Sequence, residues 1–135
     1  MKPQPIPILG LAHIGIRVHD LERSVRFYEL LGFMKTAGPI GPEPVAILAH
    51  PSGVEVNLVL NAPNANELNI LMDVPEKYPG ITHFALLCPD IMAAMERLEA
   101  AGVSVSGGPV QFGPGAKGIF VRDPDRNVIE LHQRG

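Results

Sequence analysis

The chain carries one pattern twice: LAHIGIRVHDLERSVRFYELLGF at residues 11–33 and ITHFALLCPDIMAAMERLEAAGV at residues 81–103. Equivalent positions, seventy residues apart, hold the same residue type in both copies. They are His13 and His83, Asp20 and Asp90, Glu29 and Glu99, and Gly32 and Gly102. A repeat of this kind predicts a fold built from two similar modules.

The composition suits one compact domain. With 135 residues, of which 46% are hydrophobic and 19% charged, the chain can bury a sizeable core. A net charge of -3 and the lack of Trp or a basic stripe argue against a nucleic-acid partner. No apolar run approaches the roughly 20 residues that span a bilayer, so no membrane partner is expected. The single Cys88 and an N-terminus too short and Pro-rich for a signal peptide favour a cytoplasmic protein.

Each copy predicts a strand followed by a helix. Apolar and other residues alternate over 13–18, which is the period of a strand with one buried face. Asp20 and Asp90 then stand where a helix N-cap accepts hydrogen bonds from free amides. Gly32 and Gly102 follow the apolar stripe of each helix and predict where it ends.

Two strands joined by a tight turn are expected after each helix. The expected pairs are 45–49 with 54–60 and 118–122 with 128–133, around turns at 51–53 and 123–126. A further short strand is expected near 32–36 and near 103–105. Each half is then βαβββ, and we predict an α+β fold of two tandem modules.

The whole chain, 1–135, is predicted to be a single domain. Its modules are expected at about 9–61 and 79–133, joined by a linker at about 62–78. This linker is longer than an ordinary connection and contains an apolar patch at 68–72. For the patch, a strand or turn packed on the sheet is favoured over a lid or a dimer contact.

Two histidines and one glutamate stand away from the expected core. Alternation puts His13 and His83 on the non-core faces of their strands, and it puts Glu130 opposite Ile129 and Leu131. If the repeats pair about a pseudo-twofold axis, these faces converge in one cavity. Two imidazoles and a carboxylate suit a divalent transition metal, so we predict these three polar residues as metal ligands.

Alignment of the two turns makes Asn57 the counterpart of Glu130 in the repeat. A neutral amide oxygen is a poor ligand for a transition metal. Asn57 is therefore expected to be a hydrogen-bonding group of the cavity rather than a ligand.

Three stretches resemble the signatures of the vicinal oxygen chelate superfamily: HIGIRVHDLERSVRFYELLGF, THFALLCPD and DPDRNVIELHQ. This superfamily includes glyoxalase I, bleomycin resistance proteins, extradiol dioxygenases and fosfomycin-resistance transferases. The resemblance covers about residues 9–133. It implies paired βαβββ modules that form a U-shaped mixed sheet around a metal-binding cavity. It also implies a homodimer with one divalent metal ion per chain, which could be Zn, Ni, Mn or Fe.

The resemblance can be carried over residue by residue. His13, His83 and Glu130 match the metal ligands of the family. Asn57 stands where glyoxalase I has a second glutamate and where the epimerases of the family have glutamine. The dioxygenases and fosfomycin enzymes use two histidines and one glutamate, which is the set found in this chain.

Four more residues are expected at the substrate or beside the ligands. Arg17 and Asn61 match residues with which glyoxalase I binds the glutamyl carboxylate of glutathione, and a guanidinium suits a carboxylate. The alternative for this pair is a surface salt bridge and a hairpin-end amide. Lys117 is either a cation at the cavity mouth or a solvated loop residue. His132 shares the face of Glu130 and could support it.

The resemblance, together with these residues, implies a glyoxalase-I-like lyase or isomerase. The metal would bind vicinal oxygens of a small substrate, such as a glutathione or other thiol conjugate. Glu130, the one carboxylate of the predicted site, would move the proton. The alternative is an Fe(II) dioxygenase with a two-His-one-carboxylate triad. A thiol transferase, which would need a tyrosine near Phe120, and a non-enzymatic drug-binding resistance protein rank lower.

Overall fold

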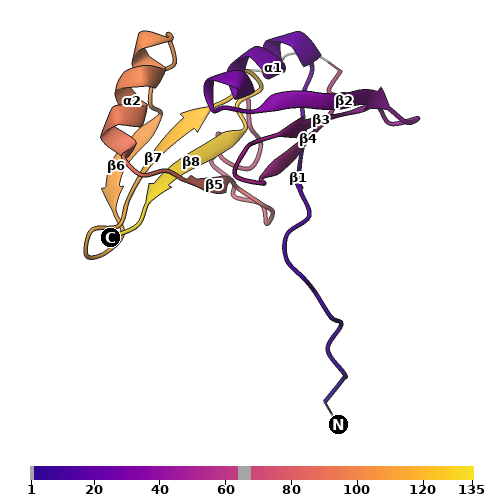
Figure 1. The fold of residues 1–135 in the computed structure, drawn as a ribbon, viewed down its shortest axis with the longest axis horizontal. Coiled ribbons are helices and arrows are strands. Elements are labelled where there is room, and N and C mark those ends of the chain that lie inside the picture. Colours follow the sequence, from indigo (N-terminus) through magenta and orange to yellow (C-terminus); the bar gives the residue numbers. More distant parts are fainter. Residues whose placement is uncertain (1, 64–67) are drawn as a thin grey trace.

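Both predicted βαβββ modules are present in the computed structural model, which describes residues 2–63 and 68–135 (Figure 1). The first module consists of β1 (Ile14–Arg17), α1 (Leu21–Leu30), β2 (Met34–Ile40), β3 (Val45–Ala49) and β4 (Glu55–Val59). The second consists of β5 (Phe84–Leu87), α2 (Ile91–Ala100), β6 (Gly107–Gln111), β7 (Lys117–Arg122) and β8 (Val128–Gln133).

Each module forms one four-stranded mixed sheet. The strand orders are β1-β4-β3-β2 and β5-β8-β7-β6, so the two copies have the same topology. In both sheets the first strand runs parallel to the last one, and the remaining pairs are antiparallel. Figure 1 shows the modules side by side, with a helix packed against each sheet. The α+β class and the tandem modules are therefore confirmed.

The helix boundaries follow the predicted capping residues. The Asp20 carboxylate accepts a hydrogen bond from the backbone N–H of Arg23 at 3.0 Å. Asp90 accepts from the first-turn amides of α2 in the same way. Gly32 and Gly102 follow the helices with φ angles of +89° and +84°, a conformation that glycine adopts without a steric cost.

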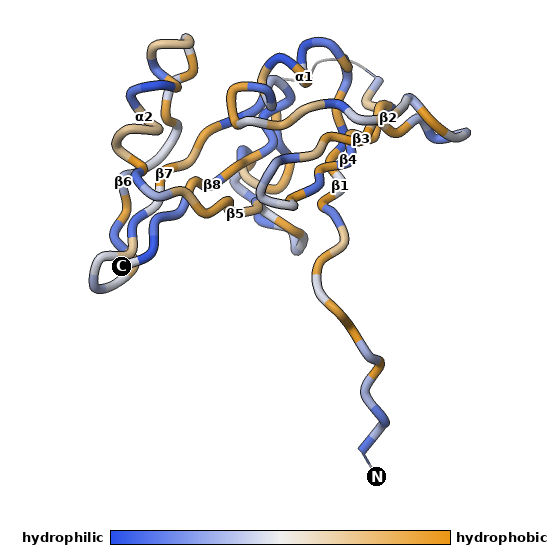
Figure 2. Tube along the Cα trace, in the orientation of Figure 1, coloured by the Kyte–Doolittle hydropathy of each residue, from blue (hydrophilic) through white to orange (hydrophobic). Residues whose placement is uncertain are grey.

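The alternation of the inner strands decides which side chains form the core. Val56 and Leu58 of β4 and Ile129 of β8 are fully buried, and they meet helix residues such as Tyr28 and Ile91. One hydrophobic cluster runs through both modules. Figure 2 shows the same apolar segments along the strands. Full burial of each such side chain contributes about 1.5–3 kcal/mol, so the shared cluster holds the modules together.

Two polar contacts also cross between the modules, from α1 to the β7–β8 turn. The Tyr28 hydroxyl donates to Asp123 Oδ2 at 2.8 Å, and both side chains are buried. Burial raises the pKa of Asp123, and it raises the pKa of Tyr28 well above its usual value. Arg23 Nη2 lies 2.8 Å from Asp125 Oδ1. The second module therefore rests on the first helix through this turn.

The prediction of a strand near 103–105 was wrong. Val103 donates its N–H to Leu98 O at 2.8 Å, so its backbone still closes α2. Sheet pairing begins only where Ser106 N donates to Phe120 O, and β6 starts at Gly107. The alternating valines pack on the core without belonging to a ladder, which explains the misleading pattern. In the first half the expected strand is present but later and longer than 32–36.

The linker between the modules is a turn anchored to the β7–β8 hairpin. Residues 64–67 of the predicted linker lie outside the described residues. Beyond them, Asp73 accepts from Arg122 Nη2 at 2.9 Å and from Arg126 Nε at 2.8 Å. Asn69 Nδ2 donates to Arg126 O at 3.0 Å. The apolar patch at 68–72 is thus held on the second module.

Across the described ranges, the helices are too short or too polar to cross a membrane.

Removal of the Asp73 charge should destabilise the protein in a pH-dependent way. Hydrogen bonds from Arg126 and Arg122 hold the pKa of Asp73 well below its usual value of 3.8. The carboxylate therefore contributes stability above about pH 4, and this contribution is lost as the pH falls toward the folded-state pKa. For Asp73→Asn we expect a free energy of unfolding about 1–3 kcal/mol lower at pH 7 by urea denaturation.

The difference between wild type and Asp73→Asn should shrink as the pH falls below 4. Glu76→Gln is the matched control in the same linker, because Glu76 pairs with the exposed Tyr78 hydroxyl rather than with either arginine. A wild-type–variant difference that stays constant from pH 7 to pH 3 would contradict this account.

Candidate metal centre

A buried carboxylate lies between two imidazoles on the second module. Glu130 Oε1 is 3.2 Å from His83 Nε2, and Glu130 Oε2 is 2.6 Å from His132 Nδ1. The Glu130 side chain is only 7% exposed. A carboxylate so far out of water requires partners that offset its desolvation, and the two imidazoles are those partners.

Strand pairing brings these three residues together. Ile129 and Leu131 of β8 are buried in the core, so Glu130 and His132 must point to the opposite face of the sheet. The parallel neighbour β5 pairs in register with β8 from Phe84 onward, and His83 directly precedes that residue. His83 therefore reaches Glu130 from the adjacent strand.

Two aromatic rings and one glycine complete the wall of this site. Phe112 stacks on His132 with ring centroids 5.5 Å apart, and Phe120 meets His83 edge-on at 5.7 Å. A Cβ at Gly118 would lie 2.9 Å from Glu130 Oε2 and 2.7 Å from Phe112 Cε2. Phe112 and Gly118 were missed from the sequence, because a ring in a Gly/Pro-rich loop and a strand glycine give no signal of their own.

The His83–Glu130 pair fits a divalent metal ion. Two donors that bind one ion at about 2.1 Å are separated by roughly 3.0–3.4 Å, and the observed separation is 3.2 Å. With an ion bound, His83 Nδ1–H can donate a hydrogen bond to the Thr82 hydroxyl, 2.9 Å away, and the Nε2 lone pair is then available to the ion. An ionised carboxylate only accepts, so His132 Nδ1 donates to Glu130.

His13 and Asn57 lie on the first module. His13 lines a cavity of about 650 Å³ together with His83, Gly15 and Arg17, and Glu130 does not line it. Asn57 Oδ1 is buried and has no hydrogen-bond partner among the described residues. A buried acceptor without a partner costs about 1–3 kcal/mol, but Asn57 does not line the cavity that His13 and His83 share.

The predicted three-ligand set is not assembled within a single chain. Over residues 2–63 and 68–135, no group of three or more His, Cys, Asp or Glu side chains is placed to hold a metal ion. The structure brings His83, Glu130 and His132 into contact, whereas His13 only shares a cavity with His83. Ligation by His13 stays a prediction.

The expected anchor for a substrate carboxylate is already paired. Arg17 Nε donates to Asn61 Oδ1 at 2.7 Å, and Asn61 Nδ2 donates to Glu43 Oε1 at 3.0 Å. Arg17 Nη2 is also 3.8 Å from the same Glu43 oxygen. Glu43, which the sequence did not point to, balances the charge of Arg17. Lys117 is exposed at the start of β7.

The paired modules and the His–Glu site define a known class, the vicinal oxygen chelate fold. A family model described as the Glyoxalase/Bleomycin resistance protein/Dioxygenase superfamily matches residues 10–131. The chain belongs to this superfamily. No curated protein matches the sequence significantly.

Solved structures similar to this chain include proteins of several kinds. TnmS3, an antibiotic binding protein from Streptomyces sp. CB03234, is 27% identical with a TM-score of 0.72, and the match covers 97% of this chain and 100% of TnmS3. A glyoxylase/bleomycin resistance protein/dioxygenase domain from Frankia sp. EAN1pec is 23% identical, with a TM-score of 0.77 and coverage of 96% and 94%. The fosfomycin resistance protein FosX from Listeria monocytogenes is 19% identical, with a TM-score of 0.70 and 96% of each chain covered. The last two show the fold alone.

Crowding at Gly118 should disturb the site, whereas the same change at Gly15 should not. Gly118→Ala places a methyl group against Glu130 and Phe112, so we expect the free energy of unfolding to fall by about 1–3 kcal/mol. Gly15 lies on the exposed side of β1 with nothing within 4 Å of a built Cβ. Gly15→Ala should therefore change stability by less than about 0.5 kcal/mol in the same urea titration. Equal effects of the two substitutions would show that the space at Gly118 is not needed.

Proposed function

We propose that the protein is a metal-dependent enzyme of the glyoxalase-like lyase or isomerase type. Its substrate would be a small molecule that presents two adjacent oxygens to the metal, such as a thiol conjugate. The observation that carries this proposal is the 3.2 Å separation of His83 Nε2 and Oε1 of the buried Glu130, beside the rings of Phe112 and Phe120.

His83 and Glu130 would hold the ion, with His13 as the third ligand. His13 would be supplied by the same chain, in which it lines one cavity with His83, or by a second chain of a homodimer. The donor set accepts Zn, Ni, Mn or Fe. A bound divalent ion supplies Lewis-acid polarisation of the substrate oxygens.

Glu130 and His132 together can hold and move one proton. If Glu130 binds the ion through Oε1, its Oε2 still faces His132 Nδ1 at 2.6 Å. With its Nδ1–H donated to this oxygen, His132 would take the substrate proton at Nε2 and return it, while Glu130 stabilises the protonated ring. General acid–base chemistry therefore does not require Glu130 to leave the metal, which answers the lack of a second carboxylate at Asn57.

The first module would bind the rest of the substrate. The free Oδ1 of Asn57 would accept a hydrogen bond from a substrate hydroxyl. Arg17 and Asn61 would bind an acidic tail, and an incoming carboxylate would replace Glu43 beside the guanidinium. Lys117 would add positive charge at the mouth.

Two other functions are supported by specific observations. Two histidines and one carboxylate also suit an Fe(II) dioxygenase. Similarity to TnmS3, at 27% identity, supports binding of a small molecule without turnover. Each of these makes a different prediction in the activity test below.

Metal binding should depend on the three proposed ligands. Purified protein is expected to bind about one divalent ion per chain, measured by elemental analysis after dialysis. His83→Ala, Glu130→Ala and His13→Ala should each weaken this binding by at least about 100-fold, because each removes a direct ligand. His19→Ala and His50→Ala are matched controls, since these rings contact Ala62 O and Ser52 instead. Unchanged metal content in the three ligand variants would contradict the assignment.

The activity test separates the three functions. The metal-loaded protein is assayed with the methylglyoxal–glutathione hemithioacetal under nitrogen, and then with catechols in air. Turnover under nitrogen is expected. Turnover that requires oxygen would identify a dioxygenase instead. Tight binding of an antibiotic with no turnover in either assay would identify a binding protein.

A further inference from the structure

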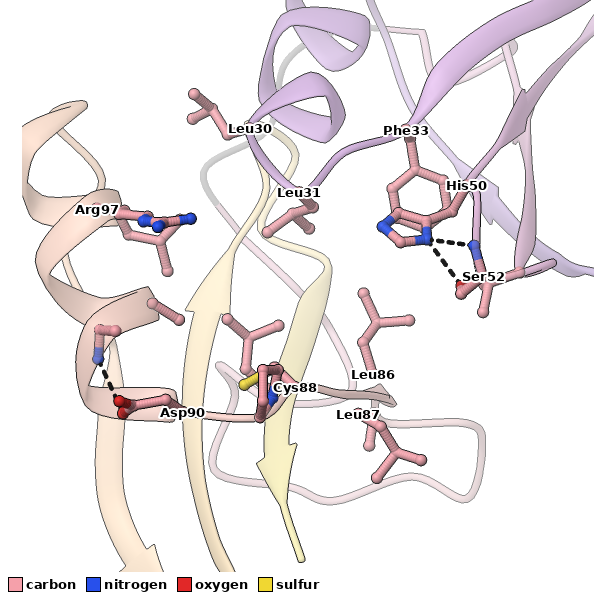
Figure 3. A pocket seen from close by; sticks show the side chains of 17 residues that line it. Leu30, Leu31, Phe33, His50, Ser52, Leu86, Leu87, Cys88, Asp90 and Arg97 are labelled. Carbon is pink, nitrogen blue, oxygen red and sulfur yellow. Dashed lines mark hydrogen bonds between the residues drawn. The ribbon is translucent and has the colours of Figure 1, made fainter.

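A second, larger cavity lies between the modules on the side of β5. Its volume is about 920 Å³, and it is bounded by the C-terminal end of α1, the start of β2, the β3–β4 turn and α2 (Figure 3). Its apolar lining includes Leu30, Leu31, Phe33, Leu86, Leu87 and Leu98. None of the proposed metal ligands lines it, so its role is separate from the proposed function.

The floor of this cavity is the free edge of a strand. In the described part of the chain β5 pairs only with β8, and residues 85–90 all line the cavity. Cys88 donates its N–H to His132 O at 2.9 Å. Because backbone groups alternate along a strand, those of Leu86 also face β8, whereas those of Ala85 and Leu87 face the cavity. Such an edge can pair with another extended segment.

The repeat indicates what kind of segment is missing there. The equivalent cavity beside β1 is lined by Leu68–Leu71 and by Ile81, which belong to the segment that leads into β5. The corresponding segment that leads into β1 is the N-terminal arm, residues 2–13. None of the arm residues lines the cavity beside β5 in this chain.

The arm is apolar, exposed and extended away from the body of the molecule (Figures 1 and 2). Ile6 is 79% exposed, Ile8 is 77% exposed and Leu11 is 81% exposed. Apolar side chains that lie this far out of water favour a partner surface.

Prolines give the arm only one edge that can pair. Pro3, Pro5 and Pro7 occupy alternate positions, so in an extended segment their missing N–H groups share one edge. Ile6 and Ile8 present their N–H and C=O groups on the other edge, and their side chains share one face. The arm thus offers the backbone groups of Ile6 and Ile8 for pairing, as β5 offers those of Ala85 and Leu87. The proline edge of the arm prevents a further strand from joining.

We propose that the N-terminal arm of one chain adds as an edge strand to β5 of a second copy of the chain. Ile6 and Ile8 insert into the apolar cavity of that copy and cover its free edge. A second copy is the occupant because the arm runs away from the strands and helices of its own chain (Figure 1), and no arm residue lines the cavity of that chain.

The single cysteine of the chain allows a direct test, because Cys88 lines the cavity. A chain with Ile8→Cys and Cys88→Ala is mixed with the wild-type chain, and the mixture is oxidised with diamide. Here a disulfide between the arm cysteine and Cys88 can form only between two chains. We expect a mixed disulfide-linked dimer, twice the 14.5 kDa chain mass, with the peptides around residues 8 and 88 joined in mass spectrometry. Ile6→Cys in the same Cys88→Ala chain tests a pairing of the arm with β5 that is shifted by two residues.

Matched controls separate docking from random collision. Glu22→Cys in the Cys88→Ala chain places an exposed thiol on α1, and its yield with wild type sets the background. A second set of variants carries the arm thiol at Gln4→Cys. In this chain, Ile6→Asp/Ile8→Asp should reduce the yield of the mixed dimer at least fivefold. Pro5→Asp/Pro7→Asp adds the same charge on the other face of the arm and should reduce the yield less. A yield no higher than that of Glu22→Cys at both arm positions would overturn the proposal. So would an intrachain disulfide, in place of a dimer, when Ile8→Cys is combined with the native Cys88.

Discussion

Strand β8 has to bury Ile129 and Leu131, and this requirement positions the rest of the site. Because side chains alternate along a strand, Glu130 and His132 point to the opposite face of the sheet. Parallel pairing with β5 places Ala85 opposite Glu130 and His83 two residues before it on the same face, and pairing with β7 places Phe120 beside Glu130. The carboxylate is buried because the core beneath it fixes the strand and the aromatic rings above it exclude water. The energy of the apolar core is therefore what holds a charged group at a defined place.

The sequence predicted the fold well because the repeat doubles every signal. Asp20 and Asp90, or Gly32 and Gly102, each support the interpretation of the other, and the structure has caps and helix ends at all four. Prediction failed where a local pattern had a different cause. The alternating valines at 103 and 105 pack on the core without pairing, because the backbone of Val103 is used to close α2.

The site could be predicted only as far as strand alternation reaches. Alternation gave Glu130 and His132 a common face, and the repeat drew attention to His83. It could not show that Glu43 balances Arg17, because that contact depends on how the loop before β3 folds back. It could not show that Phe112 covers His132 either, because the ring comes from the loop between β6 and β7. Residues that act through loop geometry leave no periodic trace in the chain.

The contact between Tyr28 and Asp123 makes the two copies of the repeat unequal in local stability. The β7–β8 turn is tied to α1 by this buried hydrogen bond and by the Arg23–Asp125 ion pair. The corresponding β3–β4 turn, around Ser52, faces α2 across an open cavity, and in the described residues no hydrogen bond or ion pair joins them. Unfolding of helix α1 therefore has to break two polar contacts with the hairpin of the other module. In the described residues, separation of helix α2 from the first module breaks no buried polar contact. We therefore expect local opening to require less free energy on the side of α2 than on the side of α1.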